Sequence, residues 1–461
     1  MSKYKEEVER AGKLADAGEP DAAMAICERV LQDEPDNHQA LYVVGTVLLE
    51  SAKFAQAIQI GKRITHLKPR ATPGWSLLAV VWAAMHRYED SLRAAEKAHE
   101  CLRDAKTVSD VAYAYTNMGE WVQADRWSRE SIALAQKAMC GDPEKDRRYK
   151  EALRDSLVHQ VYCQLAFGNW AEGFKGYRMT LRTKWRKEYQ YGDSQEWWGD
   201  PDAVVMVTGE QGLGDEIMAA SVVPDAIRGS KKFILDCDHR LVGLFRRSFP
   251  DAIVTGTRRE QTIELPILPT HHKSMFGLQE IYRKTDDDFP REPYLVPRAD
   301  YVQMFKALLD RPTIGIAWSG GFARTGLEQR SAGLAAFLPL LRRGGQFVSL
   351  QYKDDSAEVA EFEKQHGIKV LRVPWATGQG VDCDLLAGLL GACDEVIGVH
   401  TSSLHLAAAM GVPTTFLTHR GSGWRYARHE LPWYPNTTQT FAKRTGESWR
   451  DCVGRLAEAR K

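Results

Sequence analysis

The run GEQGLGDE at residues 209–216 combines three glycines with three acidic residues, directly after the apolar run AVVMVT. Glycine-rich turns after strands often hold phosphates through backbone N–H groups, but carboxylates repel a phosphate. A carboxylate at the start of the following helix is instead stabilised as the anion and can accept a proton. We therefore take Asp215 as a candidate general base, with Glu210 and Glu216 as weaker candidates. A tight turn with a capping aspartate is the structural alternative.

A second run with chemical potential is HTSSLHLAAAMG, residues 400–411, which follows an expected strand at 395–399. Three consecutive hydroxyl side chains, Thr401, Ser402 and Ser403, stand at the start of a helix of small residues. The free N–H groups and the positive dipole end of such a helix attract phosphates. The run predicts a diphosphate site, and an ordinary capped helix is the alternative.

Two arginines lie in the run GIAWSGGFARTGLEQRSAG, which leaves another expected strand at Trp318. Arg324 and Arg330 precede a helix that is expected to begin near Ser331. An arginine there can hold a phosphate with two parallel N–H groups. Solvated loop arginines are the alternative.

These residues need a scaffold, and the second half of the chain has an α/β pattern. Short apolar runs alternate with helical stretches, which indicates parallel sheets covered on both faces. The expected strands lie at 203–209, 232–237, 252–256, 263–269, 313–320, 346–352, 369–374, 395–400 and 413–418. The proline-rich segment 289–300 divides them into two doubly wound, Rossmann-like domains that face a cleft, which is the GT-B architecture.

The first 185 residues form an expected all-α array. Pro35 and Pro69 are 34 residues apart, and the small residues Ala23, Ala57, Ser91 and Ala124 recur at spacings of 34, 34 and 33. This is the tetratricopeptide period, with small side chains where paired helices cross. We expect about four repeats between residues 3 and 137, then one more helix pair at 151–182. Such superhelices bind peptides or proteins; an array that only supports the second half is the alternative.

Composition excludes several classes of function. Lys+Arg and Asp+Glu both number 61, so no net charge favours nucleic acid or an anionic membrane. The eight cysteines show no metal or disulfide spacing, and no metal site is expected. The charged N-terminus and the lack of a long apolar run argue against a signal peptide and a membrane span. We expect a soluble cytoplasmic protein.

Five segments in order make the chain resemble tetratricopeptide-repeat proteins with a heptosyltransferase-like glycosyltransferase domain. They are FGNWAEGFKGYRMTLR, GEQGLGDEIMAASVVPD, GIAWSGGFARTGLEQRS, HTSSLHLAAAMGVP and GWRYARHELPWYP. The resemblance implies a GT-B fold and inverting sugar transfer from a nucleotide donor, without a metal or other cofactor. It matches Asp215 to the general base, Thr401–Ser403 and His405 to the diphosphate site, and Arg330 to a phosphate-binding cation. His400 departs from the usual aspartate at its position.

The resemblance divides the chain into a repeat array (1–185), an acceptor domain (200–298) and a donor domain (299–461). The expected donor-side residues are Trp318, Ser319, Arg330, Gln351, His400, Thr401, Ser402, Ser403 and His405. The expected acceptor-side loop consists of Glu210, Gln211, Gly212, Gly214 and Glu216, around Asp215. His271 and His272 are expected in a loop, and Trp424, Arg425, Trp433 and Tyr434 either line the cleft or pack.

The expected partners are a nucleotide sugar and a protein or peptide acceptor bound by the array, although a glycan acceptor stays open. Two other functions are compatible with the pattern. A nucleotide-sugar epimerase shares the GT-B fold but needs no repeat array. A repeat scaffold with a degenerate GT-B domain would explain His400, whereas the intact Asp215 and Thr401–Ser403 argue against it.

Overall fold

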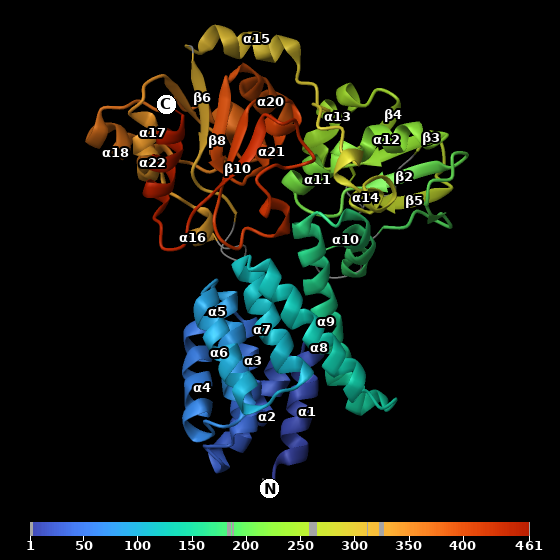
Figure 1. The fold of residues 1–461 in the computed structure, drawn as a ribbon, viewed down its shortest axis with the longest axis vertical. Helices are drawn as coiled ribbons and strands as arrows, with labels where there is room; N and C mark the ends of the chain where they lie inside the picture. Colours follow the sequence, from blue (N-terminus) through green and yellow to red (C-terminus); the bar gives the residue numbers. More distant parts are fainter. Residues whose placement is uncertain are drawn as a thin grey trace. The chain divides into compact units, whose positions relative to one another are not determined.

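The computed structural model describes residues 3–181, 186, 189–257, 265–310, 312–321 and 327–460. The chain divides into two compact units, Met1–Cys163 and Gln164–Lys461. Figure 1 shows the first as helices and the second as two sheets with helices around them. In the described ranges no helix is long and apolar enough to cross a membrane.

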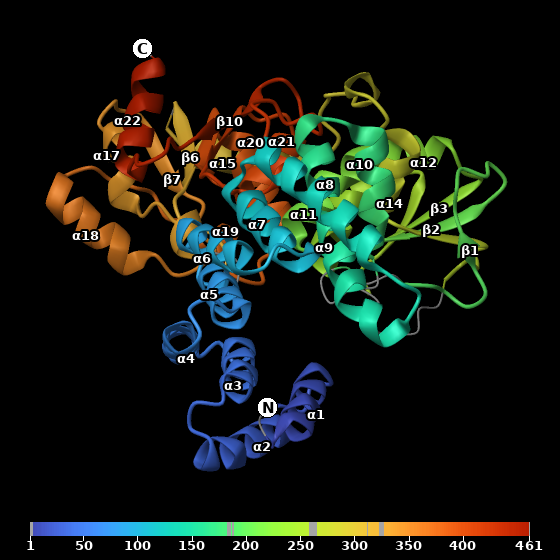
Figure 2. The same cartoon turned by 60° about the horizontal axis from the view of Figure 1, so that its bottom comes forward.

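The first unit is a stack of helix pairs, seen from two directions in Figures 1 and 2. The four residues that recur at the repeat spacing, Ala23, Ala57, Ser91 and Ala124, are all buried, which confirms their predicted place between packed helices. Small side chains there let helices approach closely. Its first helices in the described residues are α1 (Lys5–Asp16), α2 (Pro20–Asp33), α3 (His38–Glu50), α4 (Phe54–Leu67), α5 (Thr72–Ala84), α6 (Tyr88–Cys101), α7 (Ala105–Met118) and α8 (Trp121–Ala138).

Two further helices follow, as the sequence predicts: α9 (Pro143–Phe167) and α10 (Trp170–Tyr177). The sequence grouped α10 with the array, but the structure places it in the second unit. There its aromatic side chains pack on rings far along the chain. The Trp170 ring lies 5.1 Å from Phe289 and 5.7 Å from Trp433, centroid to centroid. These ring contacts, which the helical sequence pattern of α10 does not show, place α10 in the second unit and not in the array.

The second unit contains two five-stranded sheets, and every strand pair in them is parallel. The first has the order β1-β5-β2-β3-β4 and the second β10-β9-β8-β6-β7. The strands of the first are β1 (Gln195–Glu196), β2 (Val204–Thr208), β3 (Lys232–Asp236), β4 (Ala252–Thr255) and β5 (His271–Ser274). Those of the second are β6 (Thr313–Ala317), β7 (Gln346–Ser349), β8 (Glu395–Val399), β9 (Thr414–Thr418) and β10 (Thr438–Ala442).

In both sheets, successive strands are first added on one side of the first long strand and then on its other side. In the first sheet β2 lies between β3 and β5, and in the second β6 lies between β7 and β8. Ligands of open parallel sheets bind where the strand order reverses, at the carboxyl ends of the strands. The two candidate ligand sites are therefore the loops after β2 and β5 in the first sheet and the loops after β6 and β8 in the second.

Helices connect and cover the strands. Their bounds are α11 (Leu213–Ala219), α12 (Val223–Arg228), α13 (Val242–Ser248), α14 (Gly277–Tyr282), α15 (Ala299–Leu308), α16 (Leu327–Arg330), α17 (Leu338–Leu341), α18 (Ser356–His366), α19 (Pro374–Thr377), α20 (Cys383–Ala392), α21 (Ser402–Ala409) and α22 (Trp449–Ala459). Short 3-10 helices are η1 (Arg178–Thr180), η2 (Ala220–Val222), η3 (His239–Leu241), η4 (Asp286–Asp288), η6 (Leu334–Phe337) and η7 (Trp424–Tyr426).

The structure corrects the predicted position of the strand that pairs with β2 on the side away from β3. The described part of the predicted strand 263–269 is not a strand, and β5 comes directly after it at His271–Ser274. The predicted loop placement of His271 and His272 is therefore wrong. The segment HHKS is polar, but its buried groups have partners: His272 Nδ1 lies 3.0 Å from Ser194 Oγ, and Lys273 Nζ lies 2.7 Å from Glu196 Oε1.

Other differences lie at the sheet edges. The predicted strand 369–374 makes only one bridge, Val348 to Leu371. The strands β1 and β10 were not predicted. β1 has two residues, too few for a periodic pattern, and β10 has the polar sequence TQTFA.

Candidate functional site

Asp215 is the third residue of α11, which begins where the loop after β2 ends. Its Oδ2 accepts a hydrogen bond from the Gly212 N–H at 3.3 Å. This contact satisfies one of the N–H groups that precede the first helical turn. The Asp215 side chain is 34% exposed, so part of the carboxylate faces solvent.

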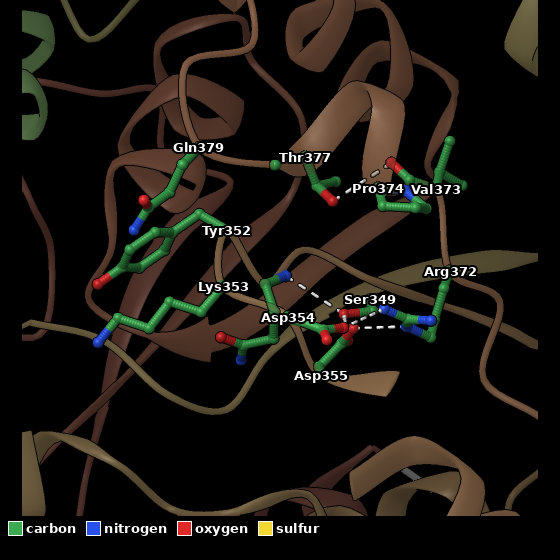
Figure 3. Close-up of a pocket in the computed structure, with 12 residues that line it drawn as sticks. Ser349, Tyr352, Lys353, Asp354, Asp355, Arg372, Val373, Pro374, Thr377 and Gln379 are labelled. Carbon is green, nitrogen blue, oxygen red and sulfur yellow. Dashed lines mark hydrogen bonds and ion pairs between the residues drawn. The ribbon is translucent and has the colours of Figure 1, made fainter. Parts of the chain in front are cut away.

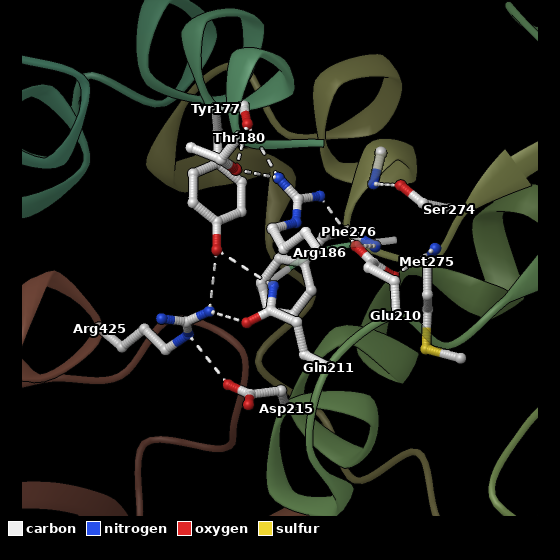
Figure 4. Close-up of polar contacts among 11 residues, drawn as sticks. Tyr177, Thr180, Arg186, Glu210, Gln211, Asp215, Ser274, Met275, Phe276 and Arg425 are labelled. Carbon is white, nitrogen blue, oxygen red and sulfur yellow. Dashed lines mark hydrogen bonds and ion pairs between the residues drawn. The ribbon is translucent and has the colours of Figure 1, made fainter. Parts of the chain in front are cut away.

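Arg425 reaches the same carboxylate from the other sheet's side of the unit, as Figure 4 shows. Its Nε lies 3.3 Å from Asp215 Oδ1, and its Nη2 donates to Gln211 Oε1 at 2.9 Å and to Tyr177 Oη at 3.1 Å. Burial by itself lowers the pKa of Arg425, but the neighbouring Tyr177 and Asp215 outweigh that effect and raise the pKa above its ordinary value. Arg425 is therefore a permanent cation beside Asp215.

The other two carboxylates of the loop are engaged inside the protein. Glu210 pairs with Arg186 at 2.8 Å, and the two side chains are 1% and 4% exposed. Glu210 also accepts from the N–H groups of Met275 and Phe276, so it ties the loop after β2 to the loop after β5. Glu216 is buried and accepts from the Asp238 N–H at 2.8 Å. Of the three acidic residues, only Asp215 is open to a substrate.

Gly214 allows the helix with Asp215 to pack against α21. A Cβ at this position would lie 2.9 Å from Cδ2 of His405 and 3.5 Å from Cα of Ser402. The first distance is shorter than ordinary van der Waals contact. The close approach brings the loop of the first sheet beside the first turn of α21.

The first turn of α21 leaves polar groups unsatisfied. Thr401 is the N-cap residue, but its hydroxyl does not accept from the helix. The N–H groups of Ser402, Ser403 and Leu404 have no acceptor within the helix because of their position. His405 is the first residue whose N–H bonds back, to the Thr401 carbonyl at 3.2 Å.

Three buried polar atoms at this turn have no hydrogen-bond partner among the described residues: Arg330 Nε, His400 Nε2 and Thr401 Oγ1. Arg330 is fixed by its Nη2, which donates to the His400 carbonyl at 2.9 Å. Burial, reinforced by Arg330, holds the pKa of His400 well below its ordinary value, so the ring is neutral. Buried groups are normally satisfied, and a cluster of exceptions points to a ligand.

His405 stands behind this turn and has both ring nitrogens engaged. Nδ1 lies 2.5 Å from Tyr434 Oη, and Nε2 lies 2.8 Å from Tyr426 Oη. Burial lowers the pKa of His405 to about 4. The ring could contact a ligand directly only by breaking one of these hydrogen bonds. The geometry therefore favours a role in which His405 holds the start of α21 in position.

The loop after β6 is held in place by its own side chains. Trp318 is buried and its Nε1 donates to Glu358 Oε2 at 2.8 Å. Gln351, with its amide oriented to satisfy both ends, accepts from the Trp318 and Ser319 N–H groups at 2.7 and 2.9 Å. The Ser319 and Ser331 hydroxyls are 3.1 Å apart. Arg324 lies outside the described residues.

A cavity of about 430 Å³ opens at the carboxyl end of β7, next to this loop. Figure 3 shows Tyr352, Lys353 and Gln379 on one side of it and Thr377 on another. Tyr352 Oη and Lys353 Nζ donate to the Gly321 carbonyl at 3.2 and 3.5 Å. Its volume lies within the range of small-molecule sites. Apart from Gln351, the residues that line the cavity belong to no sequence motif, so the sequence alone does not predict them.

Comparison with known proteins identifies the repeats. Residues 14–81 match the family model of the tetratricopeptide repeat. The first unit is therefore an all-α array in which these residues match tetratricopeptide repeats. Over 450 residues the chain is 26% identical to Protein FlbA of Caulobacter vibrioides, an alignment that covers 92% of this chain and 73% of FlbA.

The solved structures that are similar to part of the chain include the following two. One is TTC0263, a tetratricopeptide-repeat protein of Thermus thermophilus, with a TM-score of 0.32 and 21% identity over 38% of this chain and 88% of that one. The other is MamA of Desulfovibrio magneticus, with a TM-score of 0.28 and 14% identity over 39% of this chain and 92% of that one.

No group of three or more His, Cys, Asp or Glu side chains within the described ranges has an arrangement that could hold a metal ion. The arrangement instead offers one open carboxylate, one buried cation beside it, and unsatisfied donors at a helix N-terminus. Gln211, Gly212 and Gly214 contribute by holding Arg425, Asp215 and α21, respectively.

The packing of α11 on α21 predicts that alanine destabilises the protein at Gly214 but not at Gly212. Gly214→Ala places a methyl group against His405, whose ring is held by two tyrosines, and overpacking costs about 1–3 kcal/mol. Gly212→Ala is the control, because its Cβ would make an ordinary contact of 3.4 Å with Asp215 Oδ2 at a φ of −75°. Urea unfolding followed by tryptophan fluorescence measures both. A Gly214→Ala variant as stable as the wild type would contradict this packing.

Proposed function

We propose that the second unit is a GT-B glycosyltransferase that moves a sugar from a nucleoside-diphosphate donor to an acceptor hydroxyl with inversion. One observation carries the proposal: the unsatisfied Arg330 Nε, His400 Nε2 and Thr401 Oγ1 lie where the strand order of the second sheet reverses, around the start of α21, the helix on which Gly214 packs. Two doubly wound sheets in one unit provide the matching scaffold.

The donor's diphosphate binds at the first turn of α21. The free N–H groups and the Thr401 hydroxyl donate to phosphate oxygens, and Arg330 adds a cation through Nε. A neutral His400 can donate from Nε2 without carrying a charge. The helix dipole contributes only about 0.3–1 kcal/mol, whereas a hydrogen bond to a charged group contributes about 1.5–3 kcal/mol. Arg330 is therefore the side chain that matters most for affinity.

The nucleoside occupies the cavity at the end of β7. β6 separates β7 from β8, so the cavity and the first turn of α21 are two strand spacings apart, about 10 Å. A nucleoside diphosphate can bridge such a span along the edge of the sheet. Tyr352 supplies an aromatic ring, and Lys353 a cation, next to the loop that Gln351 fixes.

Asp215 activates the acceptor. Its carboxylate takes the proton of an acceptor hydroxyl as the oxygen forms a bond to the anomeric carbon. The bond from that carbon to the diphosphate oxygen breaks on the opposite face, and its electron pair leaves with the diphosphate. The charge that develops there is stabilised by the donors of α21, an electrostatic effect that is often the largest in catalysis.

The tetratricopeptide array presents a protein acceptor to the second unit. Arrays of this kind use their extended surfaces to bind peptides and proteins. The array also distinguishes this proposal from an epimerase, which converts a nucleotide sugar alone.

The donor site predicts nucleotide binding that depends on Arg330. Calorimetric titration with a panel of nucleoside diphosphates should give micromolar to millimolar affinity, and Arg330→Ala should weaken it by about 1.5–3 kcal/mol. Tyr352→Ala should weaken binding of the nucleotide but not of inorganic diphosphate. Arg342→Ala, at an exposed arginine, is the control. Failure of every nucleotide to bind at millimolar concentration would exclude the proposed donor site.

The proposed base predicts a selective loss of turnover. Asp215→Asn keeps a helix-capping side chain and should fold normally, but an amide cannot accept the proton. Release of nucleoside diphosphate should fall by about two to four orders of magnitude, while donor affinity changes little. Most of the activity surviving in a folded variant would remove Asp215 from the mechanism.

The array predicts where acceptor choice resides. Deletion of residues 1–137 should abolish incorporation of labelled sugar into protein from an extract of the source cells, with nucleotide affinity unchanged, because repeats contact mainly their neighbours. If the truncated chain labels protein as well as the full chain does, or labels only glycan, the array does not select a protein acceptor.

A further inference from the structure

Arg425 is a buried cation whose surroundings are built to hold it. The guanidinium carbon lies 4.6 Å from the centroid of the Trp424 ring and 5.0 Å from that of Phe276. Its side chain is only 18% exposed. Removing a cation from water is expensive unless nearby groups compensate. The groups that compensate for burying the Arg425 charge therefore indicate the role of this residue.

Those partners converge on Asp215. Among the described residues, Arg425 forms an ion pair with the Asp215 carboxylate alone, and its Nε lies 3.3 Å from Asp215 Oδ1. The contact acts through charge, because Nε–H is not aligned as a hydrogen bond to that oxygen. The aligned bonds go from Nη2 to Gln211 Oε1 and Tyr177 Oη. The guanidinium is thus oriented by neutral groups, and its charge is left for Asp215.

Tyr177 and Gln211 also hold one another. Gln211 Nε2 donates to Tyr177 Oη at 3.1 Å, so the three side chains close a ring of hydrogen bonds, visible in Figure 4. Tyr177 ends α10, Gln211 lies in the loop after β2, and Arg425 lies in η7. Three segments far apart in sequence meet at this point, beside the carboxylate that Gly212 holds by its other oxygen.

Arg428, three residues further along the chain, has the contacts of an arginine with a purely structural role. Arg428 donates from two nitrogens to Asp286 at 2.7 and 3.0 Å, and it lies over the Trp170 ring. Its charge is matched by a bidentate partner that Trp170 also binds. Arg425 differs, because its aligned bonds go to neutral groups and its carboxylate is partly exposed.

We propose that Arg425 is a positioning residue that keeps the Asp215 carboxylate directed toward the first turn of α21. The inference rests on the proposed function, in which Asp215 is the general base. Asp215 has one oxygen held by the Gly212 N–H and the other by the charge of Arg425, which leaves lone pairs on both for a proton. Without Arg425 the half-exposed side chain would be free to turn toward solvent. A small misplacement of a catalytic group can reduce turnover about 10²-fold.

The experiment compares three substitutions at Arg425 in the full chain. Arg425→Met keeps an apolar stem between the two rings but removes the charge, and kcat should fall about 10²-fold with donor affinity within about twofold of wild type. Arg425→Lys keeps the charge and should retain more activity than Met. Arg425→Ala opens a slot between the rings, and added methylguanidinium should restore part of kcat. Arg428→Ala is the matched control, with normal kcat and no response to methylguanidinium.

Coupling to Asp215 supplies the second measurement. If Arg425 acts through Asp215, Arg425→Met should cause little further loss in an Asp215→Asn background. A folded Arg425→Met variant with wild-type kcat, or equal further losses in both backgrounds, would overturn the inference. If the Met and Ala variants do not fold, Arg425→Gln decides, because glutamine is polar but uncharged: a loss of kcat of about 10-fold or more supports the inference, and wild-type kcat overturns it.

The two proposals fail in different ways. Normal turnover of Asp215→Asn would reject the proposed base, whatever Arg425 does. A strong loss in Asp215→Asn with normal turnover in the folded Arg425 variants would leave the proposed function intact and reject only the positioning role.

Discussion

The close packing of α11 on α21 is the constraint on which the candidate site depends. The two helices follow strands of different sheets, and they approach so closely at Gly214 that a methyl group there would meet the His405 ring at 2.9 Å. His405 cannot easily move away, because tyrosines hold both of its nitrogens and its low pKa keeps it neutral. The first turn of α21 and the Asp215 carboxylate are side by side for this reason. Without the contact, each would be an ordinary helix start.

Buried polar groups then fix the loops that end at this contact. Glu210 with Arg186 holds the loops after β2 and β5 together, Glu216 holds Asp238 in the loop after β3, and Gln351 holds the loop after β6. Such groups are costly to bury unless they are fully bonded, and when they are bonded they specify one arrangement. Three of the buried atoms that have no partner among the described residues, on Arg330, His400 and Thr401, lie together at the start of α21. A preorganised binding site needs loops that are fixed by hydrogen bonds around polar groups that are left for the ligand.

The patterns that the sequence carries locally were the ones that predicted the structure. The 34-residue spacing of small residues located the repeats, and apolar runs such as VVMVT and EVIGV located central strands. Asp215 and Thr401–Ser403 were recognised from short motifs, and their closeness follows from the topology. Strands with polar sequences escaped prediction: β5 reads HHKS and is stabilised by Ser194 and Glu196, which no local pattern connects to it. The bonds from Tyr177 and Gln211 to Arg425 join residues up to 248 positions apart, and the cavity at β7 depends on segments brought together only by folding.

The most direct test of the central claim is a crystal structure of the full chain with a nucleoside diphosphate bound. The account predicts phosphate oxygens on the first N–H groups of α21, on Thr401 Oγ1 and on Arg330 Nε, with the nucleoside in the cavity at β7 and Asp215 facing the terminal phosphate. A nucleotide bound elsewhere, with Arg330, His400 and Thr401 still unsatisfied, would contradict it.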